Sequence, residues 1–376
     1  MGNNKTPSIR FKGFTDPWEQ RKFEDIAVRS SSISSESGLP RVEYEDIISG
    51  TGRLNKNIFA KESDKTGIVF HKGDVIYGKL RPYLQNWLLP SFNGLAVGDF
   101  WVLQPQNADS SFLYRLIQSR QFDEVANQST GTKMPRSDWK LVSKTEFFIP
   151  SAIGEQAAIG AYFEQLDDLI TLHQRKYNKL LNVKKSMLEK MFPKNGSNIP
   201  EIRFKGFTDP WEQCKFSDVI DIGSGMDYKH LGEGNIPVYG TGGYMLSVNK
   251  ALSYDKDAIG IGRKGTIDKP YILRAPFWTV DTLFYCIPKE HNNLDFINCI
   301  FQNVDWKKKD ESTGVPSLSK VIINNVETAI PTFDEQQKIG AYFSELNNLI
   351  TLHQREWKGK RLWIIINCLL NTIKNG

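Results

Sequence analysis

Two glycine-rich segments of this chain come close to known phosphate-binding motifs. The first, Gly73-Asp-Val-Ile-Tyr-Gly78-Lys79, has the spacing of a P-loop, in which backbone amides and a lysine hold the phosphates of a nucleotide. A P-loop continues with Ser or Thr to ligate Mg²⁺, whereas Leu80 follows here, and Pro82 prevents the helix whose N-terminus would face the phosphate. The segment therefore does not predict a nucleotide-hydrolysing site.

The second segment, Gly260-Ile-Gly262-Arg-Lys-Gly265, has the glycine spacing of a dinucleotide-binding fingerprint. The residues that follow, Thr-Ile-Asp-Lys-Pro, do not open the helix that the fingerprint requires. A glycine-rich turn that presents Arg263 and Lys264 fits better. Because the first segment also follows a predicted strand and carries two cations, Lys79 and Arg81, we predict a basic hairpin shared by both halves of the chain.

We find no residues that predict catalysis or a metal site. Asp16-Pro17-Trp18 and Asp209-Pro210-Trp211 are similar to an element of amino-methyltransferases, but no glycine loop for a methyl donor precedes either. None of the five histidines pairs with a cysteine or serine as in a nucleophilic site, and they form no predicted ligand cluster. The four cysteines lack a CxxC pair and are predicted to be reduced thiols.

Clustered cations give a better indication of function. Lys133, Arg136 and Lys140 follow one Ser-Thr-Gly sequence, and Trp306-Lys307-Lys308-Lys309 precedes a second. Such groups neutralise phosphates, and guanidinium groups read guanine edges, although a solvated basic face is the alternative. The net charge of +5 is compatible with an anionic partner. The candidate DNA-contacting residues are Lys79, Arg81, Lys133, Arg136, Lys140, Arg263, Lys264, Lys307 and Lys308.

These residues lie in a plan that the chain uses twice. Ile9–Gln20 recurs unchanged as Ile202–Gln213, and each copy precedes a β-rich domain, a Ser-Thr-Gly loop, a strand ending in Ile-Pro and a long helix. Because the flanking segments are repeated while the domains between them differ, we expect the two domains to bind different ligands. The alternative is a plain duplication whose halves pack together and have no binding role. The strands are expected at 67–70, 73–78, 95–103, 236–239, 258–261, 271–273 and 282–287, and one helix per domain at 110–128 and 294–306.

The long helix is predicted over 155–191 by apolar residues at alternating spacings of three and four, which would make it about 55 Å long. It recurs from Glu335, and 13 of 17 positions are identical between Ile159–Arg175 and Ile339–Arg355. We expect the two helices to pair antiparallel; the alternative is that each caps its own domain. The expected contact sets are Ile159, Phe163, Leu166 and Ile170 against Ile339, Phe343, Leu346 and Ile350.

The 376 residues allow several domains, and 40% hydrophobic with 24% charged residues is ordinary for a globular chain. The expected divisions are 1–150 and 196–330 for the two domains, and 151–195 and 331–376 for the helices. The first residues lack the apolar region of a secretory signal, and the longest apolar run, 362–366, is too short to span a membrane. We therefore expect a cytoplasmic protein.

The twice-repeated order of short segment, β-rich domain and long helix closely resembles the DNA-specificity subunit of type I restriction-modification systems. The resemblance rests on Trp18-Glu-Gln20, the segment from Ser129 to Pro150 and Glu155-Gln156-x-x-Ile159-Gly160, all of which recur in the second half. It implies an α+β fold: two pseudo-symmetric α/β target-recognition domains separated by two long antiparallel coiled-coil helices. Each domain would read one half of a split target in double-stranded DNA, and the helices would set the spacing between the halves.

The resemblance also implies a non-catalytic adaptor without a cofactor of its own. It would bind two modification subunits, which use S-adenosylmethionine, and restriction subunits, which use ATP and Mg²⁺. A stand-alone DNA-modifying enzyme and a helical interaction scaffold without a DNA role remain as alternatives. The second helix departs from the first after Arg355 and contains Gly359, which puts its pairing beyond Trp357 in doubt. The resemblance does not predict the target sequence or the base-contacting residues.

Overall fold

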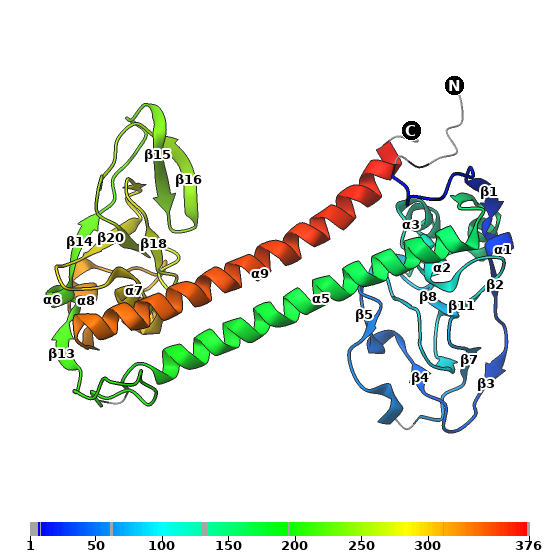
Figure 1. The fold of residues 1–376 in the computed structure, drawn as a ribbon, viewed down its shortest axis with the longest axis horizontal. Helices are drawn as coiled ribbons and strands as arrows, with labels where there is room; N and C mark the ends of the chain where they lie inside the picture. The colour runs from blue at the N-terminus through cyan, green and yellow to red at the C-terminus, as the bar shows by residue number, and fades with distance from the viewer. Residues whose placement is uncertain are drawn as a thin grey trace. The chain divides into compact units, whose positions relative to one another are not determined.

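The computed structural model describes residues 7, 9–60, 63–128, 134–194, 196–310 and 312–373, and the side chains of the last helix as far as Glu356. Contacts divide the chain into two compact units, Met1–Leu172 with Glu356–Gly376, and His173–Arg355. Both units combine helices with mostly antiparallel sheets (Figure 1). Among the described residues no helix is long and apolar enough to cross a membrane.

The first unit contains two four-stranded sheets and two strand pairs. The strand orders are β3 (Ile33–Ser34), β7 (Gly67–Phe70), β10 (Gly94–Ala96), β4 (Arg41–Val42), and β2 (Ala27–Arg29), β11 (Phe100–Pro105), β8 (Val75–Gly78), β9 (Trp87–Leu88). The pairs are β1 (Glu19–Lys22) with β12 (Glu146–Ile149), and β5 (Ile47–Ile48) with β6 (Arg53–Leu54). The helices before the long one are α1 (Phe23–Ile26), α2 (Ser110–Leu116), α3 (Arg120–Ala126) and α4 (Trp139–Lys144).

The second unit repeats the central part of this plan. Its strand orders are β14 (Ile220–Ser224), β20 (Leu283–Pro288), β17 (Ala258–Gly262), β18 (Tyr271–Leu273), and β16 (Gly243–Val248), β15 (Glu233–Gly240), β19 (Trp278–Thr279). β13 (Glu212–Lys215) pairs with β21 (Glu327–Ile330), and the helices are α6 (Phe216–Val219), α7 (Leu294–Asn303), the 3-10 helix η4 (Trp306–Lys309) and α8 (Lys320–Asn324). β14-β20-β17-β18 thus corresponds to β2-β11-β8-β9, so the predicted common plan is confirmed.

Several of the predicted elements were too long: the strand expected at 73–78 begins at Val75 (β8), the helix expected at 294–306 ends at Asn303 (α7), and two others are divided. The expected strand 95–103 is divided into β10 and β11, because Gly98 adopts a φ of 108° between them. The expected helix 110–128 is divided into α2 and α3, because Ser119 starts a new helix by accepting a hydrogen bond from the Phe122 amide. Both breaks fall at non-apolar residues, Gly98-Asp99 and Gln118–Gln121, which could have indicated them.

The long helices are α5 (Ile153–Lys190) and α9 (Phe333–Ile373), and the latter continues through Gly359. Each begins at an arginine–glutamate ion pair, here called the clamp, whose residues recur in both halves of the chain. Arg10 contacts Glu155 at 2.6 Å in the first unit, and Arg203 contacts Glu335 at 2.7 Å in the second; both carboxylates are buried. The clamp therefore joins the residues before each domain to the helix that follows it.

The glutamine after each clamp glutamate ties the helix to the domain itself. Gln156 accepts a hydrogen bond from the Asp109 amide and donates one to the Pro150 carbonyl. Gln336 makes the same two bonds, with the Asn293 amide and the Pro331 carbonyl. These four bonds explain why Glu-Gln recurs at the start of both long helices.

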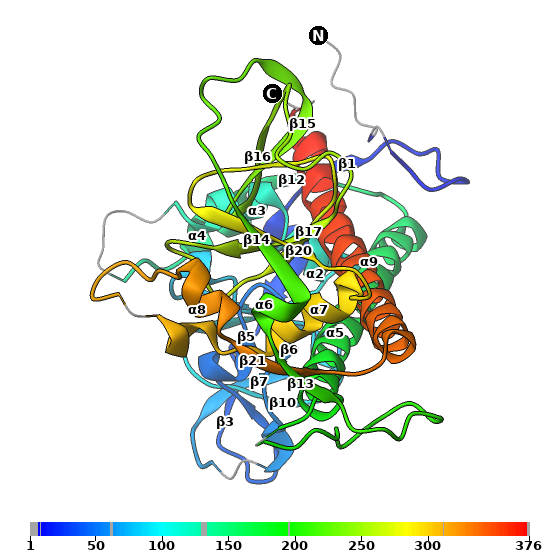
Figure 2. The ribbon, with the colours of Figure 1, turned by 90° about the vertical axis from the view of Figure 1, so that its left-hand side faces the viewer.

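A glycine one turn after each glutamine allows close packing of a domain helix. A Cβ atom on Gly160 would collide with Ser111 at the start of α2, and one on Gly340 would collide with Asn293 before α7. The start of α9 accordingly lies beside α7 (Figures 1 and 2). The repeated glycine of Glu-Gln-x-x-Ile-Gly is thus required by packing.

The predicted partners of the second contact set were wrong. Within the second unit, Ile339, Phe343, Leu346 and Ile350 are buried in one cluster with Tyr177, Leu180, Val183 and Met187 of α5. Ile159, which was expected there, packs against the core of the first unit. The segments run antiparallel, since Phe192 lies near Phe343 while His173 meets His353, so equivalent positions face each other only at their midpoint.

The two histidines at that midpoint correct a second expectation. The histidines were predicted to form no ligand cluster, but Nδ1 of His173 and Nδ1 of His353 are 3.1 Å apart. Both rings are half-buried between α5 and α9. The two residues occupy the same position in the repeated Leu-Ile-Thr-Leu-His-Gln-Arg sequence, which was the signal that could have indicated their contact.

Candidate nucleic-acid interface

The predicted basic hairpin is present in both units. In the first, β8 and β9 pair antiparallel and the loop between them begins with Lys79, Leu80 and Arg81. In the second, β17 and β18 pair antiparallel and their loop begins with Arg263 and Lys264. Four of the nine candidate cations therefore lie at corresponding ends of corresponding strands.

Each hairpin is held by the segment that leads into the next helix. In the first unit the Arg81 amide donates to the Pro135 carbonyl at 2.7 Å, and the Ser137 amide donates to the Lys79 carbonyl at 2.9 Å. The segment then enters α4, where the Asp138 carboxylate caps the helix by accepting from the Lys140 amide. The cations before and after this pairing thus belong to one small two-stranded structure.

The second unit reproduces these bonds with different side chains. The Gly265 amide donates to the Pro316 carbonyl at 2.8 Å, and the Leu318 amide donates to the Arg263 carbonyl at 2.9 Å. Ser319 caps α8 as Asp138 caps α4. The backbone frame is therefore common to both units, while the residues placed on it differ.

An acidic residue between β10 and β11 organises the cations of the first hairpin. The Asp99 carboxylate contacts Arg136 at 2.9 Å and Lys79 at 3.5 Å. The hydrogen bond from Arg136, together with the charge of Lys79, holds the pKa of Asp99 below its ordinary value. Asp99 thus brings together two of the predicted residues from distant parts of the sequence.

Tyr44 holds the same loop through two hydrogen bonds. Its hydroxyl donates to the Asp99 carbonyl at 2.6 Å and accepts from the Leu80 amide at 2.9 Å. Burial raises the pKa of Tyr44, so the phenol remains a neutral donor. Sequence reasoning missed Tyr44 and Asp99, because neither belongs to a basic cluster or a recognisable motif.

The loop beyond Arg81 presents apolar groups to solvent. Arg81 and Gln85 both have positive φ, at 49° and 55°, and they flank a 3-10 turn in which Tyr83 is 57% exposed. An exposed aromatic side chain beside cations can stack on a base or pack on a sugar. Tyr83 is therefore a further candidate contact, indicated in the sequence only by its position next to Arg81-Pro82.

In the second unit the hairpin borders a pocket of about 460 Å³. Arg263, Lys264 and Lys320 contribute cationic side chains to it, and serine hydroxyls contribute donors. The Lys320 ammonium also donates to the Ile222 carbonyl at 3.0 Å, which fixes its direction. This lining suits an anionic group such as a phosphate.

The remaining candidates are less closely grouped. Lys307 contacts Asp268 at 2.9 Å and Lys308 contacts Asp305 at 3.1 Å, so both candidate ammonium groups in η4 have acidic partners. Lys140 is exposed in the first turn of α4, three residues after Ser137. Lys133 lies outside the described residues. The structure therefore supports the hairpins as the centre of the candidate interface.

Comparison with known proteins agrees with this duplicated arrangement. Two curated relatives are similar over part of their length: the type I restriction enzyme MjaVIII specificity subunit of Methanocaldococcus jannaschii, 22% identical over 272 residues, and the type I restriction enzyme EcoDI specificity subunit of Escherichia coli, 26% identical over 200 residues. These alignments cover 62% and 50% of this chain and 62% and 44% of the relatives. The chain thus spans less than two thirds of either relative.

A solved structure has a similar fold over nearly the whole chain. It is the crystal structure of a type I restriction-modification system S subunit from M. genitalium, with a TM-score of 0.70, 15% identity and coverage of 96% of this chain and 98% of that one. The family model of the type I restriction modification DNA specificity domain matches residues 15–182 and again 208–358, together more than half of the chain. Both matches contain a basic hairpin and a clamp glutamate. On this evidence the chain belongs to the type I restriction modification DNA specificity family.

Proposed function

We propose that this chain is the non-catalytic DNA-specificity subunit of a type I restriction-modification complex. Each β-rich domain reads one half of a bipartite, asymmetric target in double-stranded DNA. One observation carries the proposal: the two basic hairpins share their backbone hydrogen bonds but present different side chains, Lys79, Arg81 and Arg136 in one and Arg263, Lys264 and Ser317 in the other. A common frame with different side chains suits two readers of different sequences.

The hairpin cations have the chemistry for both parts of DNA recognition. Lysine ammonium groups and serine hydroxyls neutralise or bind phosphates, which supplies affinity that falls with salt. Guanidinium groups such as those of Arg81 and Arg263 form paired hydrogen bonds with guanine, which supplies sequence preference. We assign the hairpins, with the segments 134–140 and 315–320 beside them, to the DNA-facing side of each domain.

The long helices have a different task in this proposal. They set the spacing between the two half-targets and dock two modification subunits, which supply S-adenosylmethionine and methylate adenine. Restriction subunits supply ATP-driven translocation and cleavage with Mg²⁺. Family membership supports these partners, and the proposal places the assembly in the cytoplasm with its DNA. The chain itself contributes recognition and no chemical step.

The two alternatives differ from this proposal in what the isolated or assembled chain does. A stand-alone modifying enzyme would methylate or cleave DNA without further subunits when given S-adenosylmethionine, ATP and Mg²⁺. A helical scaffold would assemble with its partners but bind no duplex. The matched cation arrangement in both domains favours DNA recognition over either alternative.

The test is a domain exchange in the reconstituted methyltransferase. Residues 24–150 are replaced by the corresponding domain of another specificity subunit, and methylated sites are mapped by sequencing host DNA. We expect one half of the target to change and the other to stay the same. A reciprocal exchange of residues 217–331 should change only the other half. Simultaneous change of both halves in either chimera would contradict the assignment of one half-target to each domain.

A further inference from the structure

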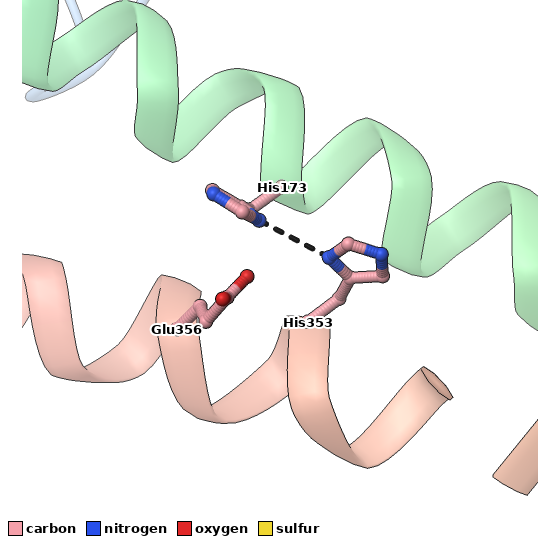
Figure 3. Close-up of side chains that lie close together, drawn as sticks. All are labelled: His173, His353 and Glu356. Atoms are coloured by element: carbon pink, nitrogen blue, oxygen red, sulfur yellow. Dashed lines mark hydrogen bonds between the residues drawn. The ribbon is translucent and has the colours of Figure 1, made fainter. Parts of the chain in front are cut away.

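The contact between His173 and His353 joins the two long helices and includes no residue of the basic hairpins. His173 lies on α5 and His353 on α9, and both residues belong to the second unit. Their Nδ1 atoms face each other at 3.1 Å, with ring centroids 5.3 Å apart (Figure 3). Elsewhere in the second unit these segments bring apolar side chains such as Leu180 and Phe343 into one cluster. A polar pair at this place therefore suggests a specific ligand.

The separation of the two nitrogens suits a shared metal ion. Imidazole nitrogens bind zinc at about 2.0–2.1 Å, and two ligands at a tetrahedral angle are then about 3.3 Å apart. The observed 3.1 Å is close to that value, so little movement would be needed to bind an ion between the rings. Sites of this kind, with ligands on facing helices, occur in helix bundles.

A third potential ligand lies on the same helix as His353. Glu356 follows it by three residues, which places both side chains on one face of α9, and Figure 3 draws it with the two rings. Two imidazoles and a carboxylate are a ligand set for zinc and its neighbours among the transition metals, whereas Mg²⁺ and Ca²⁺ prefer oxygen ligands alone.

We propose that His173 and His353 bind one divalent transition cation of the zinc class through their Nδ1 atoms, with Glu356 as the carboxylate ligand. The ion would link α5 to α9 where the two copies of the repeated His-Gln-Arg sequence meet. It would therefore act as a structural clip between the two copies of the repeated helix. A direct hydrogen bond between the two rings is the competing explanation of the short distance, and it needs no ion.

The experiment uses the untagged full-length chain, freed of metals with a chelator. Zn²⁺ is added alone and binding is measured by isothermal titration calorimetry, with thermal unfolding as a second readout. Co²⁺ replaces Zn²⁺ in a parallel titration, because its visible absorption reports nitrogen and oxygen ligation. We expect one Zn²⁺ per chain, a rise in the unfolding temperature and a cobalt spectrum that appears with the same stoichiometry.

Three variants separate the site from other histidines. His173→Asn and His353→Asn each remove one imidazole but keep a polar side chain, and we expect each to weaken Zn²⁺ binding at least 10-fold and abolish the thermal shift. His71→Asn removes an exposed histidine of the first unit and should leave both unchanged. Circular dichroism verifies that the variants fold. Absence of Zn²⁺ binding to the wild type, or binding unaltered in both cluster variants, would overturn the proposal in favour of the direct hydrogen bond.

Discussion

The amides of Arg81 and Gly265 make the same hydrogen bond in the two units, each to the carbonyl of a proline in the segment before the next helix. Both residues also have positive φ, 49° for Arg81 and 85° for Gly265. Glycine adopts this region without cost, whereas an arginine there is strained by about 1–2 kcal/mol. The first unit therefore tolerates strain to present a guanidinium at a position where the second unit has no side chain.

This strain predicts the effect of adding a side chain to the second hairpin. Gly265→Ala should lower the free energy of unfolding by about 1 kcal/mol, because the cost comes from φ alone and no heavy atom lies within 4 Å of the new Cβ. Urea denaturation followed by tryptophan fluorescence measures it. Gly314→Ala is the control, since that glycine has equally open surroundings without a positive φ. Equal losses for both variants would show that φ does not decide the cost.

Cations of the two hairpins should affect different halves of the target. Arg136→Ala and Arg263→Ala should each weaken binding of the assembled complex to its target by about 10-fold or more, equivalent to roughly 1–3 kcal/mol. Fluorescence anisotropy with duplexes in which one half-target is scrambled shows which half each variant no longer recognises. Lys250→Ala removes an exposed lysine from neither hairpin and serves as the control. If Arg136→Ala and Arg263→Ala lost discrimination at the same half, the division between the domains would be incorrect.

The clamp at the start of α9 should be important for stability. Glu335→Gln leaves the half-buried Arg203 guanidinium without its charged partner, so the free energy of unfolding should fall by about 3 kcal/mol. Chemical denaturation of the second unit measures the change. Glu201→Gln, which affects an exposed pair with Lys190, is the comparison and should leave the midpoint almost unchanged. Similar losses from both would mean that burial of the clamp contributes little.

The lowered pKa of Asp99 predicts a dependence on acid. Because the folded-state pKa lies below the ordinary value, the contribution of this carboxylate to stability is present above about pH 4 and is lost as the pH falls through the folded pKa. The difference in stability between wild type and Asp99→Asn should therefore be constant between about pH 7 and pH 5 and shrink as the pH falls below about 4. Denaturation midpoints across this range measure it. A difference that does not shrink would exclude the ionised carboxylate as its source.

The proposed spacing role predicts the result of lengthening α5. Four residues inserted after Tyr177 add about 6 Å of helix. Since B-DNA rises about 3.4 Å per base pair, the preferred gap between half-targets should grow by one or two pairs. Methylation-site mapping in a host carrying the variant measures the gap. An unchanged gap with intact DNA binding would remove the spacing role from the helices.

Much of the fold could be predicted because the two halves of the chain repeat the same order of elements. Gly67–Phe70 and Tyr271–Leu273 were predicted with the observed bounds, and α5 lies within two residues of its expected limits. The basic hairpins were also predicted, since Lys79 and Arg263 follow strands in both halves. Local sequence was sufficient there because a strand, a glycine turn and a cation are adjacent in the chain.

Contacts made over long sequence distances could not be predicted in this way. Asp99 meets Arg136 only because β11 lies beside β8, and no sequence pattern specifies that neighbour. The partners of Ile339 and Ile350 were mistaken because a repeat reveals equivalent residues and not which of them face each other. His173 and His353 are adjacent because they lie at the midpoint of an antiparallel contact, which the repeat could have indicated.

The division of α5 and α9 between the units has a consequence for synthesis. The first unit includes residues from Glu356 onward, whereas the second is a continuous stretch from His173 to Arg355. Domains generally fold as units, with N-terminal ones first, while the ribosome is still adding residues. Here the unit that is started first receives its final segment only after the whole of the second has been translated. The second unit can therefore be the first to be completed, reversing the usual order of maturation along a nascent chain.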